Sequence, residues 1–163
     1  MAEIEALNAN FNTQIEEAKE VEILYSDSAK VRVRITGPTL IYHLDKNAPK
    51  QEFPDGIFVE FFDNLGNTTS ELSARYGLRM QQRDEVIVRD SVVWESVEGE
   101  KLETEELIWD ERKKLIYTNK FVVVTTPDEI IYGHGFEANQ DFSYSKINAI
   151  EGRLKVEEQE VNE

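Results

Sequence analysis

Histidine is the side chain best suited to acid–base or metal chemistry near neutral pH, and the sequence contains only two, His43 and His134. Two histidines form a metal site only if the fold brings them together with further ligands. His134 lies between Gly133 and Gly135, a setting typical of a small polar residue at a β-bulge. We therefore predict no metal site and no catalytic role for either histidine.

Carboxylates are plentiful, with 33 Asp and Glu residues, but no group of them stands out. A pair that hydrolyses sugars needs a defined separation across a cleft, which a sequence does not show. Glu103, Glu105 and Glu106 have the spacing of a solvated strand face and turn. These acidic residues are therefore interpreted as surface residues.

Other catalytic motifs are missing from the sequence. It has no cysteine, which excludes disulfides, thiolate nucleophiles and Cys-ligated zinc. It has no phosphate-binding loop, no dinucleotide fingerprint, no calcium loop and no serine in a nucleophile-elbow context. We predict a protein that is not an enzyme, has no catalytic residue and no cofactor, and works by binding.

The charge of the chain restricts its partners. The formal net charge is -15 and the pI is about 4.6, so the electrostatic field repels nucleic-acid phosphates and disfavours anionic lipid headgroups. We predict no nucleic-acid partner. The opening residues MAEIEALNANFN have neither the basic nor the apolar region of a signal peptide. Composition is compatible with a cytoplasmic protein and with the processed form of an exported one.

Residues 1–20 are the only part of the chain with helix-like composition. Ile4, Leu7, Phe11 and Ile15 recur at steps of three and four among many Glu and Ala residues. We predict a short amphipathic helix or a linker over 1–20.

From Val21 onward the pattern has the period of two that is typical of strands. Val31, Val33 and Ile35 alternate with arginines and are predicted to share one strand face. Further short strands separated by turn residues are predicted over 40–43, 57–62, 71–76, 85–97, 100–109, 114–118, 120–126, 129–134, 143–148 and 150–156. This predicts one all-β antiparallel domain over 21–156, a sandwich, jellyroll or barrel, followed by an acidic disordered tail over 157–163.

Two stretches of the predicted domain look like copies of one unit. The first comprises 72–76 and 86–93, and the second comprises 102–107 and 115–122. Ala74 to Thr104 is a step of 30 residues, which indicates stacked hairpins, although ordinary β-alternation can produce the same match.

One passage contains a motif that identifies more than a strand-rich composition does. Residues 90–110, DSVVWESVEGEKLETEELIWD, form an apolar strand, a Gly turn and the motif L-x-T-x-x-L-x-W-D. The segments IYT at 116–118 and IYGHGFE at 131–137 follow it, and LSARY at 72–76 precedes it. In this order the segments resemble the LptC family, the periplasmic component of the lipopolysaccharide export machine, in its Bacteroidetes-type forms. The resemblance covers about residues 19–156.

The resemblance implies both a fold and a role. The fold would be a twisted antiparallel β-jellyroll of the OstA/LptA-like type, open along one side with an apolar groove. The protein would receive lipopolysaccharide from an inner-membrane ABC transporter and pass it to the next periplasmic bridge protein, which is LptA-like. It would be periplasmic and tethered to the inner membrane by an N-terminal anchor or lipoprotein signal, neither of which this sequence contains.

An apolar groove is a physically reasonable carrier for such a lipid. Removing one CH₂ group from water contributes about 0.8 kcal/mol, so an acyl chain needs shielding but no catalytic residue. We expect the inward strand faces to bind lipid, and Trp94 is ambiguous because both faces are apolar there. The predicted lipid-binding residues are Val31, Val33, Ile35, Leu72, Ala74, Tyr76, Val86, Val88, Leu102, Thr104, Leu107, Phe121 and Val123.

The sheet edges of an open jellyroll are the expected docking surfaces. We expect strands over about 21–35 to face the transporter and strands over about 143–156 to face the next bridge protein. Two other functions remain open. One is a carbohydrate-binding or enzymatic jellyroll that uses exposed aromatics such as Trp94, Trp109, Tyr117 or Tyr132. The other is an assembly module that acts through its edges and has a packed, lipid-free interior.

Overall fold

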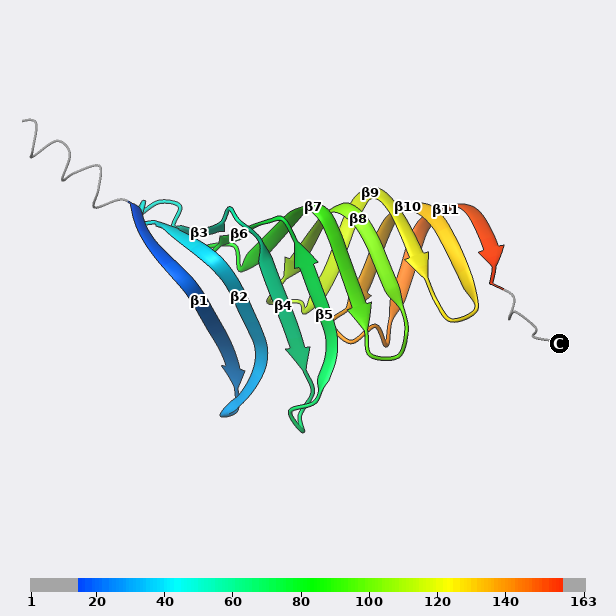
Figure 1. Ribbon diagram of the computed structural model, residues 1–163, viewed down its shortest axis with the longest axis horizontal. Helices are drawn as coiled ribbons and strands as arrows, with labels where there is room; N and C mark the ends of the chain where they lie inside the picture. The colour runs from blue at the N-terminus through cyan, green and yellow to red at the C-terminus, as the bar shows by residue number, and fades with distance from the viewer. Residues whose placement is uncertain (1–14, 157–163) are drawn as a thin grey trace, which may run out of the picture.

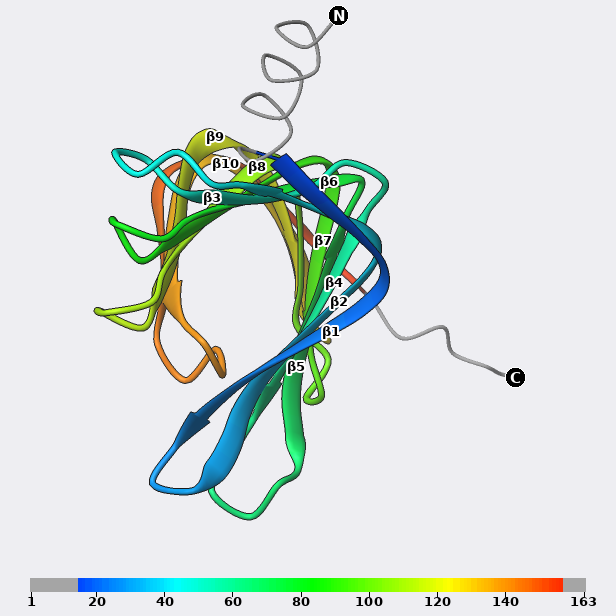
Figure 2. The ribbon, with the colours of Figure 1, turned by 90° about the vertical axis from the view of Figure 1, so that its left-hand side faces the viewer.

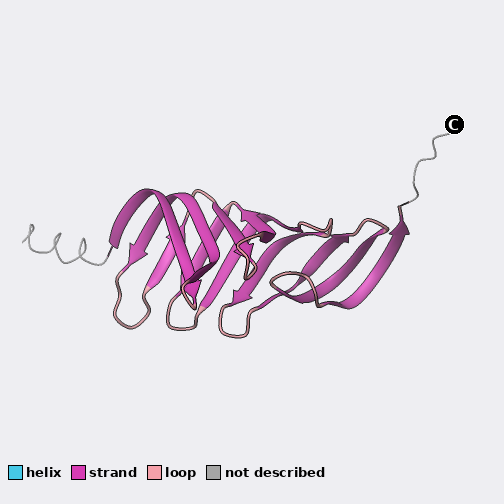
Figure 3. Ribbon diagram, turned by 90° about the horizontal axis from the view of Figure 1, so that it is seen from below, coloured by secondary structure: helices cyan, strands magenta, loops and turns pink. Residues whose placement is uncertain are grey.

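The computed structural model describes residues 15–156, which form strands and turns and contain no helix (Figures 1 and 3). The strands are β1 (Ile15–Asp27), β2 (Lys30–His43), β3 (Lys50–Phe53), β4 (Ile57–Phe62), β5 (Thr68–Ala74), β6 (Tyr76–Met80), β7 (Glu85–Ser96), β8 (Lys101–Asp110), β9 (Leu115–Thr125), β10 (Glu129–Asn139) and β11 (Ser145–Lys155). The prediction of an all-β, jellyroll-like fold is confirmed.

All strands belong to one antiparallel sheet of 11 strands. Strands β2 and β7 are long enough to pair with two shorter strands along one side. One half of β2 pairs with β4 and the other half with β3. In the same way, β7 pairs with β5 and with β6. Within residues 15–156, β1 pairs only with β2 and β11 only with β10. These two strands are the free edges, and Figure 1 shows them at opposite ends of the long axis.

The long strands bend where their ladders are interrupted, and the sheet folds over on itself there. In β7 the interruption contains Asp90 and Ser91, which have positive φ angles of 70° and 55°. In β8 the register shifts between Thr104 and Ile108, and in β10 it shifts at Gly135, which has a φ of 82°. Such bulges increase the local bend and twist of a strand. Figure 2 shows the resulting arch, viewed along the long axis.

The interruptions recur along the sequence at a regular interval. Arg75, between β5 and β6, is followed at steps of 15 residues by Asp90, Glu105, Lys120 and Gly135. The backbone N–H of Arg75 donates to the carbonyl oxygen of Asp90 at 3.0 Å, which joins two successive bends. Two strands make a hairpin, so the step of 30 residues between similar stretches corresponds to one hairpin of the stack.

The strand boundaries differ from the predictions at several places. β1 begins at Ile15, so the predicted helix or linker over 1–20 is wrong for its last six residues. Pairing with β2 outweighs the helix propensity of the Glu and Ala residues there. The rest of that prediction, over 1–14, and the predicted tail over 157–163 lie outside the described residues. The strands predicted on either side of residue 119 form one strand, β9, and those on either side of residue 149 form β11.

Candidate functional site

The inner face of the folded sheet is the apolar surface that the sequence predicts. Eight predicted residues lie there with at most 8% of their surface exposed, and Ala74 packs against them. They are Val33, Ile35, Leu72, Val86, Val88, Leu102, Thr104 and Leu107. The structure therefore brings these residues together in one core, where the Thr104 hydroxyl donates to the carbonyl oxygen of Phe121 at 2.8 Å.

Val31 does not belong to this inner face. Tyr25 of β1 pairs with Val33 and the next residue, Ser26, pairs with Val31, so Arg32 is an extra residue in β2. Because a one-residue bulge puts the side chains on its two sides out of step, Val31 and Val33 occupy opposite faces, and Val31 points outward and is 38% exposed. The prediction that Val31 lines the interior is wrong for this reason.

Tyr76 also lies on the outer face. The break between β5 and β6 at Arg75 reverses the alternation, so that Gly77 is buried and Tyr76 faces away from it. The Tyr76 hydroxyl donates to Glu52 Oε2 at 2.8 Å, and His43 Nε2 lies 2.9 Å from Glu52 Oε1. Burial, followed by the bond to Glu52, raises the pKa of Tyr76 to about 12.

Phe121 and Val123 are the remaining predicted residues that the structure places outside. Val122 and Val124 are the buried residues of this part of β9, and strand alternation puts their neighbours on the opposite face. Phe121 is 44% exposed and stacks on Tyr132, with 6.4 Å between ring centroids. Four consecutive apolar residues, 121–124, contain no alternation, so the sequence did not indicate which of them point inward.

The inner face is packed against itself. The cavity enclosed in the apolar interior has a volume of only about 10 Å³ and is lined by residues such as Phe61 and Val88. Further along the arch Trp94 is fully buried, and its ring centroid lies 3.9 Å from that of Phe142. The described structure thus has an apolar interior filled by side chains, and Trp94 is a core residue.

The loop between β10 and β11 covers the interior where the two limbs of the arch face each other. Its residue Phe142, with a φ of 66°, is 7% exposed and packs on Trp94. The carbonyl oxygen of Gln140 accepts a hydrogen bond from Ser70 Oγ at 2.7 Å, and Gln140 Oε1 accepts one from Trp109 Nε1 at 2.9 Å. The turn residues at 139–141 indicate only a turn here, and the apolar Phe142 within NQDFSY is the one sequence signal of a buried loop residue.

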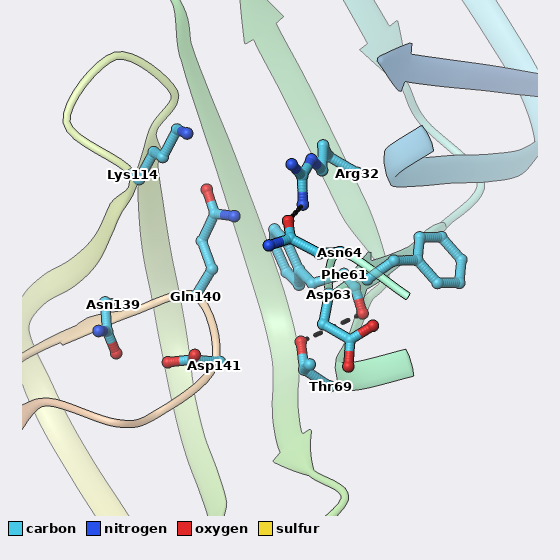
Figure 4. Close-up of a pocket in the computed structure, with 10 residues that line it drawn as sticks. Arg32, Phe61, Asp63, Asn64, Thr69, Lys114, Asn139, Gln140 and Asp141 are labelled. Carbon is cyan, nitrogen blue, oxygen red and sulfur yellow. Dashed lines mark hydrogen bonds between the residues drawn. The ribbon is translucent and has the colours of Figure 1, made fainter. Parts of the chain in front are cut away.

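Two adjoining cavities, of about 390 and 410 Å³, open beside this loop. Figure 4 shows the first, with Arg32 and Lys114 on opposite sides and Gln140 between them. The second reaches inward to the buried side chains of Val33 and Trp109. We call this pair of cavities, which opens beside the loop that covers the interior, the mouth.

The two histidines lie far apart in the pairing scheme. His43 is on β2 beside Glu52, and His134 is on β10, where it contacts Glu151 of β11. Residues 15–156 contain no group of three or more His, Cys, Asp or Glu side chains placed to hold a metal ion. The same residues contain no helix long and apolar enough to cross a bilayer.

The two edge strands differ in how they expose apolar side chains. On β11, Ile150 and Leu154 are about half exposed, and no side chain of this strand is fully buried. On β1, Ile23 packs against the core while Leu24 is half exposed on the outer face. Both edges therefore combine unpaired backbone groups with exposed aliphatic side chains.

Comparison of the chain with protein-family models and with curated proteins finds no match. The resemblance to the LptC family stays a prediction. Two of the four aromatics expected of a carbohydrate-binding face, Trp94 and Trp109, are buried. The other two, Tyr117 and Tyr132, are partly exposed, and Tyr132 lies in the outer-face stack with Phe121.

Proposed function

We propose that this protein is a periplasmic component of lipopolysaccharide export, tethered to the inner membrane. It takes lipid from an inner-membrane ABC transporter, shields the acyl chains on the inner face of its sheet, and passes the lipid to an LptA-like bridge protein. One observation carries the proposal: a single apolar inner face extends from one free sheet edge to the other. Its partly or fully buried residues run from Val21 and Ile23 on β1 to Ile147 on β11.

The position of the edges supports a role in a chain of proteins. An edge strand with unpaired N–H and C=O groups can accept a strand from another protein, and the added strand extends the sheet. Because β1 and β11 lie at opposite ends (Figure 1), docking at both would continue the sheet in two directions. It would also continue the apolar inner face from one protein to the next.

Entry of lipid requires displacement of the loop between β10 and β11. Phe142 occupies the space that an acyl chain would fill beside Trp94. Across the interior the loop is held by the contact of Phe142 with Trp94 and by the bonds of Gln140 to Ser70 and Trp109. Each acyl CH₂ removed from water contributes about 0.8 kcal/mol, so a chain of several carbons offsets the loss of those contacts.

The test is photo-crosslinking from matched positions on β8. A photoreactive residue replaces Leu102, which faces the interior, or Glu103, its outward neighbour. Lipopolysaccharide is expected to crosslink from position 102 and not from position 103. Equal crosslinking from both positions, or none from 102 in a variant that remains folded, overturns the lipid-carrier role.

The packed interior favours a second candidate, an assembly module that acts through its edges alone. This candidate predicts docking at β11 with no lipid crosslink from position 102. The carbohydrate-binding alternative has less support, because Trp94 and Trp109 are buried.

A further inference from the structure

The mouth combines an apolar wall with two cationic side chains. Its two cavities share the lining residues Arg32, Phe62, Asn64, Lys114 and Gln140. The inner cavity is also lined by Tyr25, Val33 and Trp109. Its volume of about 410 Å³ lies within the range of about 300–1,000 Å³ that is usual for ligand sites.

Neither cation at the mouth is neutralised by an acidic side chain of the described residues. Arg32 donates from Nη1 to the side-chain oxygen of Asn64, a neutral acceptor, and its buried Nε has no partner there. Lys114 forms no salt bridge with any residue in 15–156. A buried guanidinium nitrogen without an acceptor is costly, which indicates that an acceptor belongs at this position.

The acidic side chains at the mouth already have donors. Asp63 accepts backbone N–H groups of its own turn, which hold its pKa below the ordinary value. Asp141 accepts the backbone N–H of Ser143 at 2.9 Å. Glu111 binds Arg79 through both oxygens, at 2.7 and 2.9 Å. These bonds occupy acceptor atoms of the three carboxylates and leave their charges in place, and within residues 15–156 the N–H groups of Arg32 and Lys114 are not paired with any of them.

The backbone conformation at Arg32 and at Lys114 directs both side chains toward the cavity. Arg32 is the bulge residue of β2, and the bulge turns its side chain to the inner side. Lys114 closes the turn between β8 and β9 with a φ of 57°, a left-handed conformation that residues other than glycine adopt at an energetic cost. Both positions are therefore irregular points of the backbone that face one cavity from two sides (Figure 4).

We infer that the mouth binds the anionic headgroup of an amphiphile. A phosphate or carboxylate lies between Arg32 and Lys114, and the first part of the apolar chain lies against Val33 and Trp109. A guanidinium with free N–H groups suits oxyanions, and such charge-assisted bonds are stronger where water is partly excluded. The inference rests on the proposed function only in taking the ligand to be an amphiphile.

The experiment measures binding of dodecyl phosphate, below its micelle concentration, by calorimetry and by tryptophan fluorescence, to which Trp94 and Trp109 both contribute. Arg32→Gln and Lys114→Gln are each expected to weaken binding about tenfold, the effect of losing one charge-assisted hydrogen bond. Lys113→Gln removes the same charge from the adjacent exposed residue and is expected to leave the affinity unchanged. Dodecanol, which has the chain without the charge, is expected to bind more weakly than dodecyl phosphate and equally to all variants.

Three results would overturn the inference. They are equal affinities of all variants for dodecyl phosphate, equal affinities of dodecanol and dodecyl phosphate, and binding of inorganic phosphate as tight as that of dodecyl phosphate. The two control ligands separate the contributions to affinity. Inorganic phosphate carries the charge without the chain, and dodecanol carries the chain without the charge. None of these results changes the expected lipid crosslink from position 102. The headgroup site and the lipid-carrier role can therefore be refuted independently of each other.

Discussion

Glu52 shows how single side chains stabilise the outer face of the sheet. Its two carboxylate oxygens contact different residues, since His43 lies 2.9 Å from one and the Tyr76 hydroxyl donates to the other at 2.8 Å. The hydrogen bond with His43, followed by that with Tyr76, lowers the pKa of Glu52 below its ordinary value of 4.5. The three residues come from β2, β3 and β6, so the cluster joins three neighbouring strands.

This cluster predicts a specific loss of stability in acid. Because the pKa of Glu52 is lowered by folding, its contribution is complete above pH 4.5 and disappears as the pH falls through the lowered value. Glu52→Gln is expected to reduce the free energy of unfolding by about 1 kcal/mol at pH 7 and by less at pH 3. Urea denaturation at both pH values measures this. The exposed Glu103→Gln is the control, and identical losses at the two pH values would contradict the prediction.

At the scale of the element, one extra residue in β2 decides which side chains face inward. The bulge at Arg32 separates Val31, which points outward, from Val33, which is 3% exposed. The same residue carries the guanidinium that lines the mouth. The bulge thus sets both the inner face of β2 and the position of the cation.

The bulge predicts opposite outcomes for two valines two residues apart. Val33→Asp places an unpaired carboxylate in the core and is expected to reduce the free energy of unfolding by at least about 3 kcal/mol. Val31→Asp is expected to change it by no more than about 0.5 kcal/mol, because the side chain lies at the surface. Chemical denaturation compares the two variants. Similar losses would mean that β2 is regular through Arg32.

At the scale of the whole molecule, the sheet is elongated and has one free edge at each end (Figure 1). Contact of β11 in one copy with β1 in another would be heterologous, and such contacts do not close into a dimer. The net charge of -15 opposes close approach of two copies, and salt screens this repulsion. Self-association through the edges should therefore increase with ionic strength.

Sedimentation equilibrium at low and high salt tests this behaviour. The double variant Ile150→Lys, Leu154→Lys places charges on the exposed side chains of β11 and is expected to abolish salt-promoted association. Val97→Lys is the control, because Val97 is an exposed apolar residue on the turn between β7 and β8, away from the edges, and this variant should associate normally. Association that survives in the double variant would assign it to another surface.

Much of the inner face could be predicted from the sequence, because alternation identifies one strand face wherever the strand is regular. Leu102 and Val86 were found this way. The errors occur where regularity ends: at the bulge of Arg32, at the break before Tyr76 and in the uninterrupted apolar run around Phe121. A change of one residue in register reverses the face, and alternation does not indicate where such a change occurs.

The sequence by itself determined that the chain is an antiparallel β structure built from hairpins with an apolar face, because period two and turn residues are local properties. It also indicated binding rather than catalysis as the expected function. Only the tertiary structure decided that the interior is packed, that Phe142 covers it, and that Arg32 and Lys114 meet at one mouth. These features join residues far apart in the chain, and their contacts depend on how the sheet bends at its bulges, which no local pattern specifies.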